Sequence, residues 1–190
     1  MFPQLIWQKR VTEKILYITF DDGPCPGVTD FVLEQLEQYH AKATFFCVGS
    51  NVIKHPELYQ TLLQKGHVTG NHTQEHLNGL FCKSTTYYDD IERASKSIDS
   101  KLFRPPYGKI KTSQINYLKK RYQIIMWDFL TADFDADLDI ELCKKKMGKY
   151  IKPGSIIVFH DSIKAAENLK ILLPYMLHKY AAEDYQFHSL

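Results

Sequence analysis

Residues 15–23 of this 190-residue chain read ILYITFDDG. The first six residues are apolar, β-branched or aromatic, which is typical of a buried strand, and the last three are typical of a turn. Two carboxylates, Asp21 and Asp22, therefore follow directly after a strand. Because parallel α/β folds place their chemistry at the carboxyl ends of strands, this stretch predicts both a fold class and the position of a site.

The rest of the chain alternates between short apolar runs and amphipathic segments. Six further strands are expected at residues 43–48, 67–69, 102–103, 123–127, 155–160 and 185–188. Six helices are expected to begin near residues 29, 56, 84, 112, 139 and 165. We expect Thr29 and Asp139 to cap their helices, and Pro174 to bend or break the last one. This alternation predicts a parallel α/β fold, an incomplete (β/α)7 barrel, with an open doubly wound sheet as the alternative.

The composition limits the kind of protein. With 44% hydrophobic residues the chain can bury a substantial core, and its length suits a single domain over residues 1–190. The formal net charge of +2 is too even to indicate nucleic acid or an anionic membrane as a partner. The spacing of the four cysteines matches no zinc or redox motif. No pattern indicates an oligomeric state.

Location is addressed by two further observations. No apolar stretch approaches the roughly 20 residues of a membrane span, so no transmembrane segment is expected. The N-terminal residues 1–7 lack the basic and apolar regions of a secretory signal. A cytoplasmic location is therefore expected, or an extracytoplasmic one if a leader has been removed.

His72 and His76 lie four residues apart in the segment GNHTQEH, residues 70–76. On a helical turn this spacing points two imidazoles in the same direction, as a shared metal ion requires. One further carboxylate would complete a three-ligand catalytic zinc site with a position left for water. The alternative is two surface histidines in a chain that has eight. The strand-to-loop context of the segment favours the site.

Asp21 and Asp22 could divide the work of such a site. Adjacent residues at a strand end point to opposite sides, so one carboxylate can bind metal while the other accepts a proton. The spacing does not say which aspartate has which role. A DDG turn is also common without any function.

Residues 104–108 read RPPYG, a loop made rigid by two prolines. Its glycine permits the close approach of another chain segment or a ligand. The guanidinium of Arg104 could hold a carboxylate through paired hydrogen bonds. A structural turn with a surface arginine fits this pattern equally well.

His160 ends the most apolar of the expected strands. A histidine at a strand end beside a pocket is a candidate general acid, and a core histidine with satisfied hydrogen bonds is the common alternative. Asp133 could orient the imidazole and raise its pKa by charge pairing, although other aspartates crowd the same region.

These motifs together resemble the polysaccharide deacetylases, also called the NodB-homology or carbohydrate esterase family 4 domain. The resemblance runs from about Ile15 to the C-terminus, and its first two motifs are TFDDG and HTQEH. It implies that Asp21 is the general base and that Asp22, His72 and His76 hold a zinc ion. Cobalt or nickel could substitute at the same ligands.

The resemblance assigns roles to further residues. It implies that Arg104 holds the base and that the backbone N–H of Tyr107 helps to bind the oxyanion. It also implies that Asp133 tunes His160 as the general acid and that Val158 lines the acetyl pocket.

The fourth motif departs from the family pattern Asp-x-x-Asp-Trp, because residues 130–134 read LTADF. Leu130 stands in place of the first aspartate and Phe134 in place of the tryptophan, while Asp133 is retained. Phe134 could still wall the acetyl group, and with Tyr107 and Trp127 it offers an apolar face to a sugar ring, although core packing is the expected role of Trp127. The altered motif therefore leaves the shape of the substrate and the rate of the reaction less well determined than the type of reaction.

The implied reaction is removal of N-acetyl groups from an amino-sugar glycan such as chitooligosaccharide or peptidoglycan, with the acetylated glycan as the partner. An O-acetyl ester is chemically easier to hydrolyse and is an alternative substrate. A second alternative is a C–N hydrolase acting on a small amide with the same metal site. A third is a non-catalytic relative that binds glycan or metal, which the filled base, ligand and acid positions disfavour.

Overall fold

The computed structural model describes residues 4–190, so the first three residues of the segment inspected for a leader lie outside the described part. Its strands are β1 (Leu5–Ile6), β2 (Ile15–Asp21), β3 (Thr44–Cys47), β4 (Val68–Asn71), β5 (Leu102–Phe103), β6 (Gln123–Ile125), β7 (Phe129–Leu130), β8 (Ile156–His160) and β9 (Gln186–Phe187). Its α-helices are α1 (Val28–Gln38), α2 (Gly49–Lys54), α3 (Pro56–Gln64), α4 (Ser84–Ala94), α5 (Thr112–Leu118), α6 (Ile140–Tyr150) and α7 (Ala166–Ala182). Two short 3₁₀ helices follow β5 and β8, and they are η1 (Pro106–Gly108) and η2 (Ile163–Ala165). None of the helices in this part of the chain is long and apolar enough to cross a membrane.

The strands form one sheet in the order β1-β6-β5-β4-β3-β2-β8-β7, with β9 paired to β2. All of these strand pairs are parallel. Strands β2 to β6 advance in one direction and β8 returns to pair with β2, as in a barrel and unlike a doubly wound sheet. Within residues 4–190, β1 and β7 do not pair with each other, so the barrel is incomplete, and this part of the prediction is confirmed.

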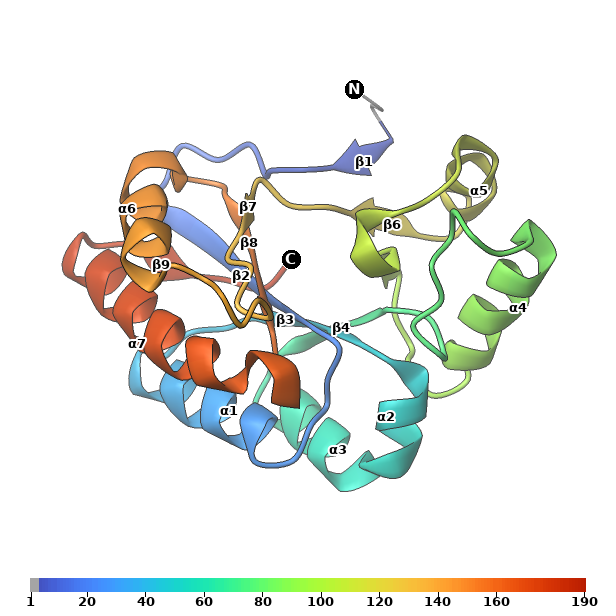
Figure 1. Ribbon diagram of the computed structural model, residues 1–190, viewed down its shortest axis with the longest axis horizontal. Helices are drawn as coiled ribbons and strands as arrows, with labels where there is room; N and C mark the ends of the chain where they lie inside the picture. Colours follow the sequence, from blue (N-terminus) through green and yellow to red (C-terminus); the bar gives the residue numbers. More distant parts are fainter. Residues whose placement is uncertain (1–3) are drawn as a thin grey trace.

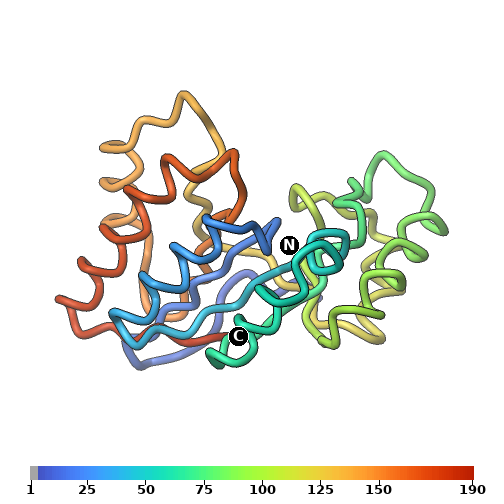
Figure 2. Tube along the Cα trace, turned by 90° about the horizontal axis from the view of Figure 1, so that it is seen from below, coloured from blue at the N-terminus to red at the C-terminus, as the bar shows by residue number. Residues whose placement is uncertain are grey.

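The helices cover the outside of the sheet unevenly. Figure 1 shows α1, α3, α6 and α7 gathered along one side of the strands, with α4 and α5 beyond β4 and β6. The view from below in Figure 2 shows the same division, because the green to yellow part of the chain stands apart from α1, α6 and α7.

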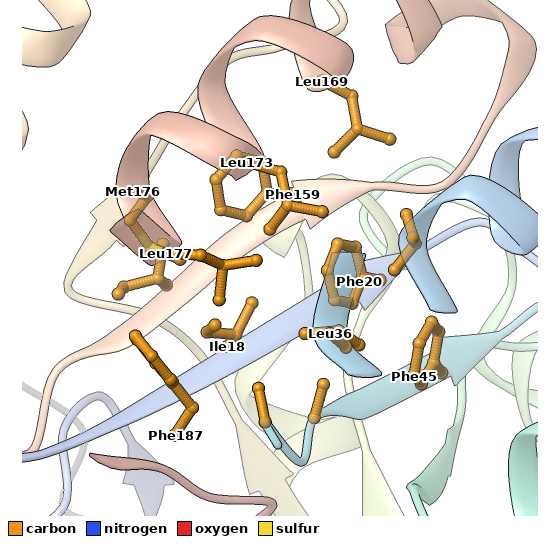
Figure 3. Close-up of a cluster of buried hydrophobic side chains, with 14 of the residues drawn as sticks. Ile18, Phe20, Leu36, Phe45, Phe159, Leu169, Leu173, Met176, Leu177 and Phe187 are labelled. Atoms are coloured by element: carbon orange, nitrogen blue, oxygen red, sulfur yellow. The ribbon is translucent and has the colours of Figure 1, made fainter. Parts of the chain in front are cut away.

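Alternation along β2 separates the two faces of the sheet. Ile18 and Phe20 belong to the core under the helices, where Phe20 stacks on Phe45 with ring centroids 4.9 Å apart (Figure 3). Tyr17 packs in a separate cluster with Phe46, on the barrel side of the sheet. Full burial of such a side chain contributes roughly 1.5–3 kcal/mol, so β2 is fixed from both faces.

The register of the strands brings the polar residues to one rim. Asp21, the last residue of β2, is in register with His160 of β8. Asn71 of β4 is in register with Phe103 of β5, so His72 and Arg104 follow neighbouring strand ends.

The structure contains all seven expected strands, with ends shifted by at most two residues. The two-residue strands β1 and β7 and the six-residue helix α2 were not predicted from the sequence. Asp139 caps α6 as expected, since its carboxylate accepts the Leu142 N–H at 2.9 Å.

Two details of the helix prediction are wrong. Thr29 does not cap α1, because the helix begins at Val28 and the Thr29 hydroxyl instead accepts the Cys25 N–H at 2.8 Å. The expected break at Pro174 does not occur, because α7 runs through the proline to Ala182, while a bend there stays a prediction. Buried leucine and methionine side chains on both sides of the proline pack into the core and hold the helix together.

Candidate active site

Asp22, His72 and His76 meet where β2 and β4 end. One donor atom of each lies within 4.8 Å of the donors of the other two. His72 Nδ1 donates to the Arg104 carbonyl oxygen at 2.8 Å, which leaves a lone pair on Nε2 of the neutral ring. The Nε2 atoms of His72 and His76 lie 3.8 and 3.1 Å from Asp22 Oδ1. The three donors predicted as metal ligands are therefore side by side.

The Oδ1 atom of Asp22 tests whether a cation fits these residues. It is buried and, within the described chain, accepts no hydrogen bond of acceptable geometry despite the two nearby imidazoles. Such an oxygen is costly to bury unless it is paired or coordinates a metal. Two histidines and one carboxylate also form a donor set used by catalytic zinc sites. The residues therefore fit a divalent cation.

The ionisation of these groups suits the same role. Burial lowers the pKa of His72 to about 4, which the charge of Asp21 only partly offsets, so the imidazole is neutral at pH 7. Burial raises the pKa of Asp22, but contact with His76 and the charge of neighbouring histidines outweigh it and lower that pKa to about 2. Neutral imidazole and ionised carboxylate are the forms that bind metal.

The histidine pair is not on a helical turn, so that part of its sequence rationale is wrong. Thr73 and His76 have φ values of 66° and 54°, and the segment between the histidines is a loop. The loop is held in place because two of its N–H groups donate to the buried Asp90 carboxylate at 2.9 and 3.1 Å. The imidazole centroids of His72 and His76 are nevertheless 5.0 Å apart.

Arg104 and Asp21 form a buried ion pair beside this cluster. Arg104 Nη1 donates to Asp21 Oδ1 at 2.7 Å and to the Thr19 hydroxyl at 2.7 Å. The remaining donors go to backbone carbonyls, Nη2 to Met126 at 3.0 Å and Nε to Ile125 at 3.3 Å. The expected paired contact with the carboxylate is therefore replaced by a single bond. Arg104 is 0% exposed, so its orientation is fixed.

Tyr107 has a strained backbone and lies next to His76. Its φ is 61°, a conformation that bulky residues adopt rarely. Its hydroxyl lies 3.1 Å from His76 Nδ1 and can accept the proton of that nitrogen, which leaves His76 Nε2 free to bind a metal. The side chain is 61% exposed and therefore faces the opening of the site.

His160 and Asp133 form the other ion pair of the site. His160 Nδ1 lies 2.7 Å from Asp133 Oδ1, and the His160 backbone N–H donates to Asp133 Oδ2 at 2.9 Å. Burial lowers the pKa of His160, but the hydrogen bond and charge of Asp133, with the charges of Asp21 and Asp22, raise it to about 9. The imidazole is therefore protonated at neutral pH. Phe134 lies edge-on to it, with ring centroids 4.9 Å apart.

The sequence reasoning missed the role of Asp161, which follows His160. This buried carboxylate accepts the Gly23 N–H at 3.0 Å and the Thr29 hydroxyl at 2.6 Å, and a side chain at Gly23 would overlap it. It therefore holds the turn in which Asp22 adopts a φ of 83°. In the sequence, only its position next to His160 could have indicated a role for Asp161 in the site.

These groups line one cavity of about 560 Å³. Its wall includes five of the residues predicted to transfer protons or to line the substrate pocket, and they are Asp21, Tyr107, Phe134, Val158 and His160. Arg104 and Asp133 lie behind that wall and contact Asp21 and His160. Four further residues line the cavity, and they are Trp127, Leu130, Ser162 and Lys164. Ser162 and Lys164 were not considered from the sequence, Leu130 is the altered position of the fourth motif, and Trp127 was expected to pack in the core but reaches the cavity wall.

Comparison with known proteins adds to this geometry. A family model described as polysaccharide deacetylase matches residues 8–123. A peptidoglycan-N-acetylglucosamine deacetylase of Bacillus cereus is 34% identical over 95% of this chain and 88% of its own length. A chitooligosaccharide deacetylase of Azorhizobium caulinodans is 34% identical over 80% of this chain and 77% of its own. Other relatives are longer, and the chain spans 55% and 38% of two of them.

A solved structure shows the same arrangement of the backbone. The crystal structure of the Bc1960 peptidoglycan N-acetylglucosamine deacetylase superposes with a TM-score of 0.92. It covers 98% of this chain and 91% of its own at 25% sequence identity.

Proposed function

Because this chain belongs to the polysaccharide deacetylase family, we propose that it is a metal-dependent hydrolase that removes N-acetyl groups from an amino-sugar glycan. The observation that supports this most is the convergence of Asp22, His72 and His76 within 4.8 Å, on the wall of the cavity that also contains Asp21 and His160. A metal-binding set, a carboxylate base and a protonated imidazole are the parts that amide hydrolysis requires.

Asp22, His72 and His76 would hold the ion. A bound zinc ion would supply a Lewis acid that polarises the amide carbonyl and lowers the pKa of water. The same donor types also accept cobalt or nickel. The second ring nitrogens are occupied by the Arg104 carbonyl and the Tyr107 hydroxyl, which orient the two imidazoles.

Asp21 is the proposed general base. Its Oδ1 accepts the hydrogen bond of Arg104, while Oδ2 lies on the side of the metal ligands, 4.0 Å from His72 Nε2. Because Arg104 is fixed by its other bonds, the carboxylate keeps one orientation as it takes a proton from the attacking water. Arg104 is therefore a positioning residue for the base.

His160 is the proposed general acid. With its pKa raised to about 9 it carries a proton at neutral pH, and Asp133 holds Nδ1 so that Nε2 can donate to the leaving nitrogen. The Tyr107 backbone N–H is the proposed protein donor to the oxyanion. Val158, Phe134 and the side chain of Tyr107 would surround the acetyl group and the sugar ring.

The direct test is acetate release by the purified chain with one equivalent of zinc. Chitooligosaccharides and peptidoglycan fragments are the N-acetylated substrates, and an O-acetylated xylan and a set of small amides are the comparisons. We expect release from the N-acetylated glycans, and loss of that release after chelation with recovery on adding zinc back. Hydrolysis of a small amide without release from any glycan would contradict the proposal.

A further inference from the structure

Lys164 lies on the wall of the catalytic cavity, although no family motif includes it. It belongs to η2, the short turn that follows β8, and is four residues beyond His160. Its Nζ lies 5.4 Å from the centroid of the Phe134 ring, which itself lies edge-on to His160. The ammonium is therefore separated from the acid by one aromatic ring.

The charges on the cavity wall divide into those with and without a protein partner. Asp21 is paired with Arg104 at 2.7 Å, and His160 with Asp133 at 2.7 Å. Asp22 faces the two metal-binding histidines. Lys164 has no ion pair or side-chain hydrogen bond in the chain from residue 4 to the C-terminus. Among the charged groups on this wall, Lys164 is therefore the one that has no oppositely charged partner in the described residues.

We propose that Lys164 binds a carboxylate on the glycan beside the acetamido group that is hydrolysed. The proposal rests on the glycan deacetylase function above and narrows its substrate class to an anionic glycan. In an alternating polymer of N-acetylglucosamine and N-acetylmuramic acid, the sugar next to the reacting one bears a lactyl carboxyl. A chitin oligomer has no such group, so Lys164 favours the muramic acid polymer.

The surroundings of Lys164 suit this role. The Phe134 ring stands where the family usually has a tryptophan, and the Lys164 ammonium lies over its face. Ser162, on the same wall, adds a hydroxyl that can donate to a carboxylate oxygen. The neighbouring Leu130 is apolar where the family usually has an aspartate, so no carboxylate at that position repels the anion.

The test compares two substrates that differ in charge. The ratio of kcat/KM for acetate release is measured with a peptide-free tetrasaccharide of alternating N-acetylglucosamine and N-acetylmuramic acid and with N-acetylchitotetraose. We expect the wild type to prefer the anionic substrate, and Lys164→Gln to lower the ratio by about twofold to fivefold, as for an ion pair with an exposed lysine. Lys164→Glu should lower it further. Lys170→Gln, an equal change of charge at an exposed site on α7, should leave the ratio unchanged.

Acetate release and the ratio of kcat/KM distinguish a failure of the carboxylate proposal from a failure of the deacetylase function on which it rests. If the wild type releases acetate from neither substrate, the deacetylase function fails. If both substrates are hydrolysed and Lys164→Gln leaves the ratio unaltered while bound zinc and circular dichroism stay normal, only the carboxylate proposal is overturned. A third substrate, in which a peptide stem blocks the lactyl carboxyl, identifies which carboxylate Lys164 binds. If the preference over N-acetylchitotetraose is retained with this substrate, the carboxylates of the stem are bound. If the preference is lost, the lactyl carboxylate is the group that is bound.

Discussion

The two sides of the catalytic cavity are built differently. On the metal side, the ends of β2, β4 and β5 bring together Asp21, Asp22, both histidines and Arg104. Buried hydrogen bonds hold them, one between Arg104 and Asp21 and three to backbone carbonyls. On the acid side, β7, β8 and η2 bring His160 to Asp133, with Phe134 and Lys164 around them.

The difference separates reaction chemistry from substrate choice. The metal side contains the residues that match the family motifs, and apart from the Asp22 carboxylate its charged groups are held by hydrogen bonds within the protein. The acid side contains both departures, Leu130 and Phe134, and Lys164, which has no charged partner among residues 4–190. We expect substitutions on the metal side to abolish the reaction, and those on the acid side to change its pH dependence and its substrate preference.

The largest effect is expected for His72→Ala. Removing one of three ligands should abolish tight zinc binding and lower acetate release by about a thousandfold or more. Zinc content after gel filtration and the circular dichroism spectrum check this, since the chain should remain folded. Normal zinc content in the variant would show that the ion is held elsewhere.

Asp21→Asn tests the division of labour between the adjacent aspartates. The amide cannot accept the proton of water, so kcat should fall by about 10²–10⁴-fold while zinc stays bound. Metal content and kcat measured on one preparation check this. Lost zinc with an unchanged residual rate would mean that Asp21 and Asp22 have exchanged roles.

Asp133→Asn tests the acid side. In the wild type the raised pKa of His160 keeps most of the acid protonated up to about pH 8, so activity should fall with a midpoint near pH 9. Without the carboxylate the pKa should return toward its ordinary value near 6.5, and activity at pH 8 should drop by about tenfold or more.

The same shift affects stability. Because the folded pKa of His160 lies above the unfolded value, the pair stabilises fully below about pH 6.5 and loses that contribution as the pH rises through about 9. Denaturant unfolding from pH 6 to 10 should therefore show a decline in the wild type that Asp133→Asn lacks. If the wild type and Asp133→Asn show the same loss of activity at alkaline pH and the same decline in unfolding free energy, Asp133 does not raise the pKa of His160.

Asp161→Asn tests how the turn at Asp22 is held. The new amide group faces a donor, either the Gly23 N–H or the Thr29 hydroxyl, so the turn should relax and zinc should bind about 10–100-fold more weakly. The control is Asp128→Asn, because Asp128 accepts the Ile156 N–H at the start of β8, away from the site. Equal zinc affinities in both variants would show that Asp161 has no part in placing the ligand.

The smallest effect is expected for Phe134→Ala. Loss of an apolar wall should raise KM by about threefold to tenfold and leave bound zinc unchanged, because the ring contacts the acid and not the metal ligands. Initial rates at saturating and limiting substrate separate KM from kcat. A drop in zinc content would show that the two sides are not independent.

Seven of the nine strands described for residues 4–190, and the rim on which the polar residues gather, were predictable from the sequence. Buried strands are continuous apolar runs, and parallel strands share one carboxyl edge. The sequence did not predict the contacts made by loops. The two histidines converge through left-handed residues in a loop that Asp90 holds in place. Arg104 also donates to the carbonyl oxygens of Ile125, in β6, and of Met126, directly after it. The roles of Asp161 and Lys164 depend on contacts with residues far away in the chain, Gly23 and Thr29 for Asp161 and Phe134 for Lys164. Sequence spacing does not reveal such contacts.

The most direct test of the account is anomalous diffraction from crystals grown with zinc. We predict a single strong peak bonded to one carboxylate oxygen of Asp22 and to Nε2 of His72 and of His76, with Asp21 held by Arg104 and outside the coordination shell. A peak bound by Asp21 in place of Asp22, or one that leaves out either histidine, would contradict the central claim.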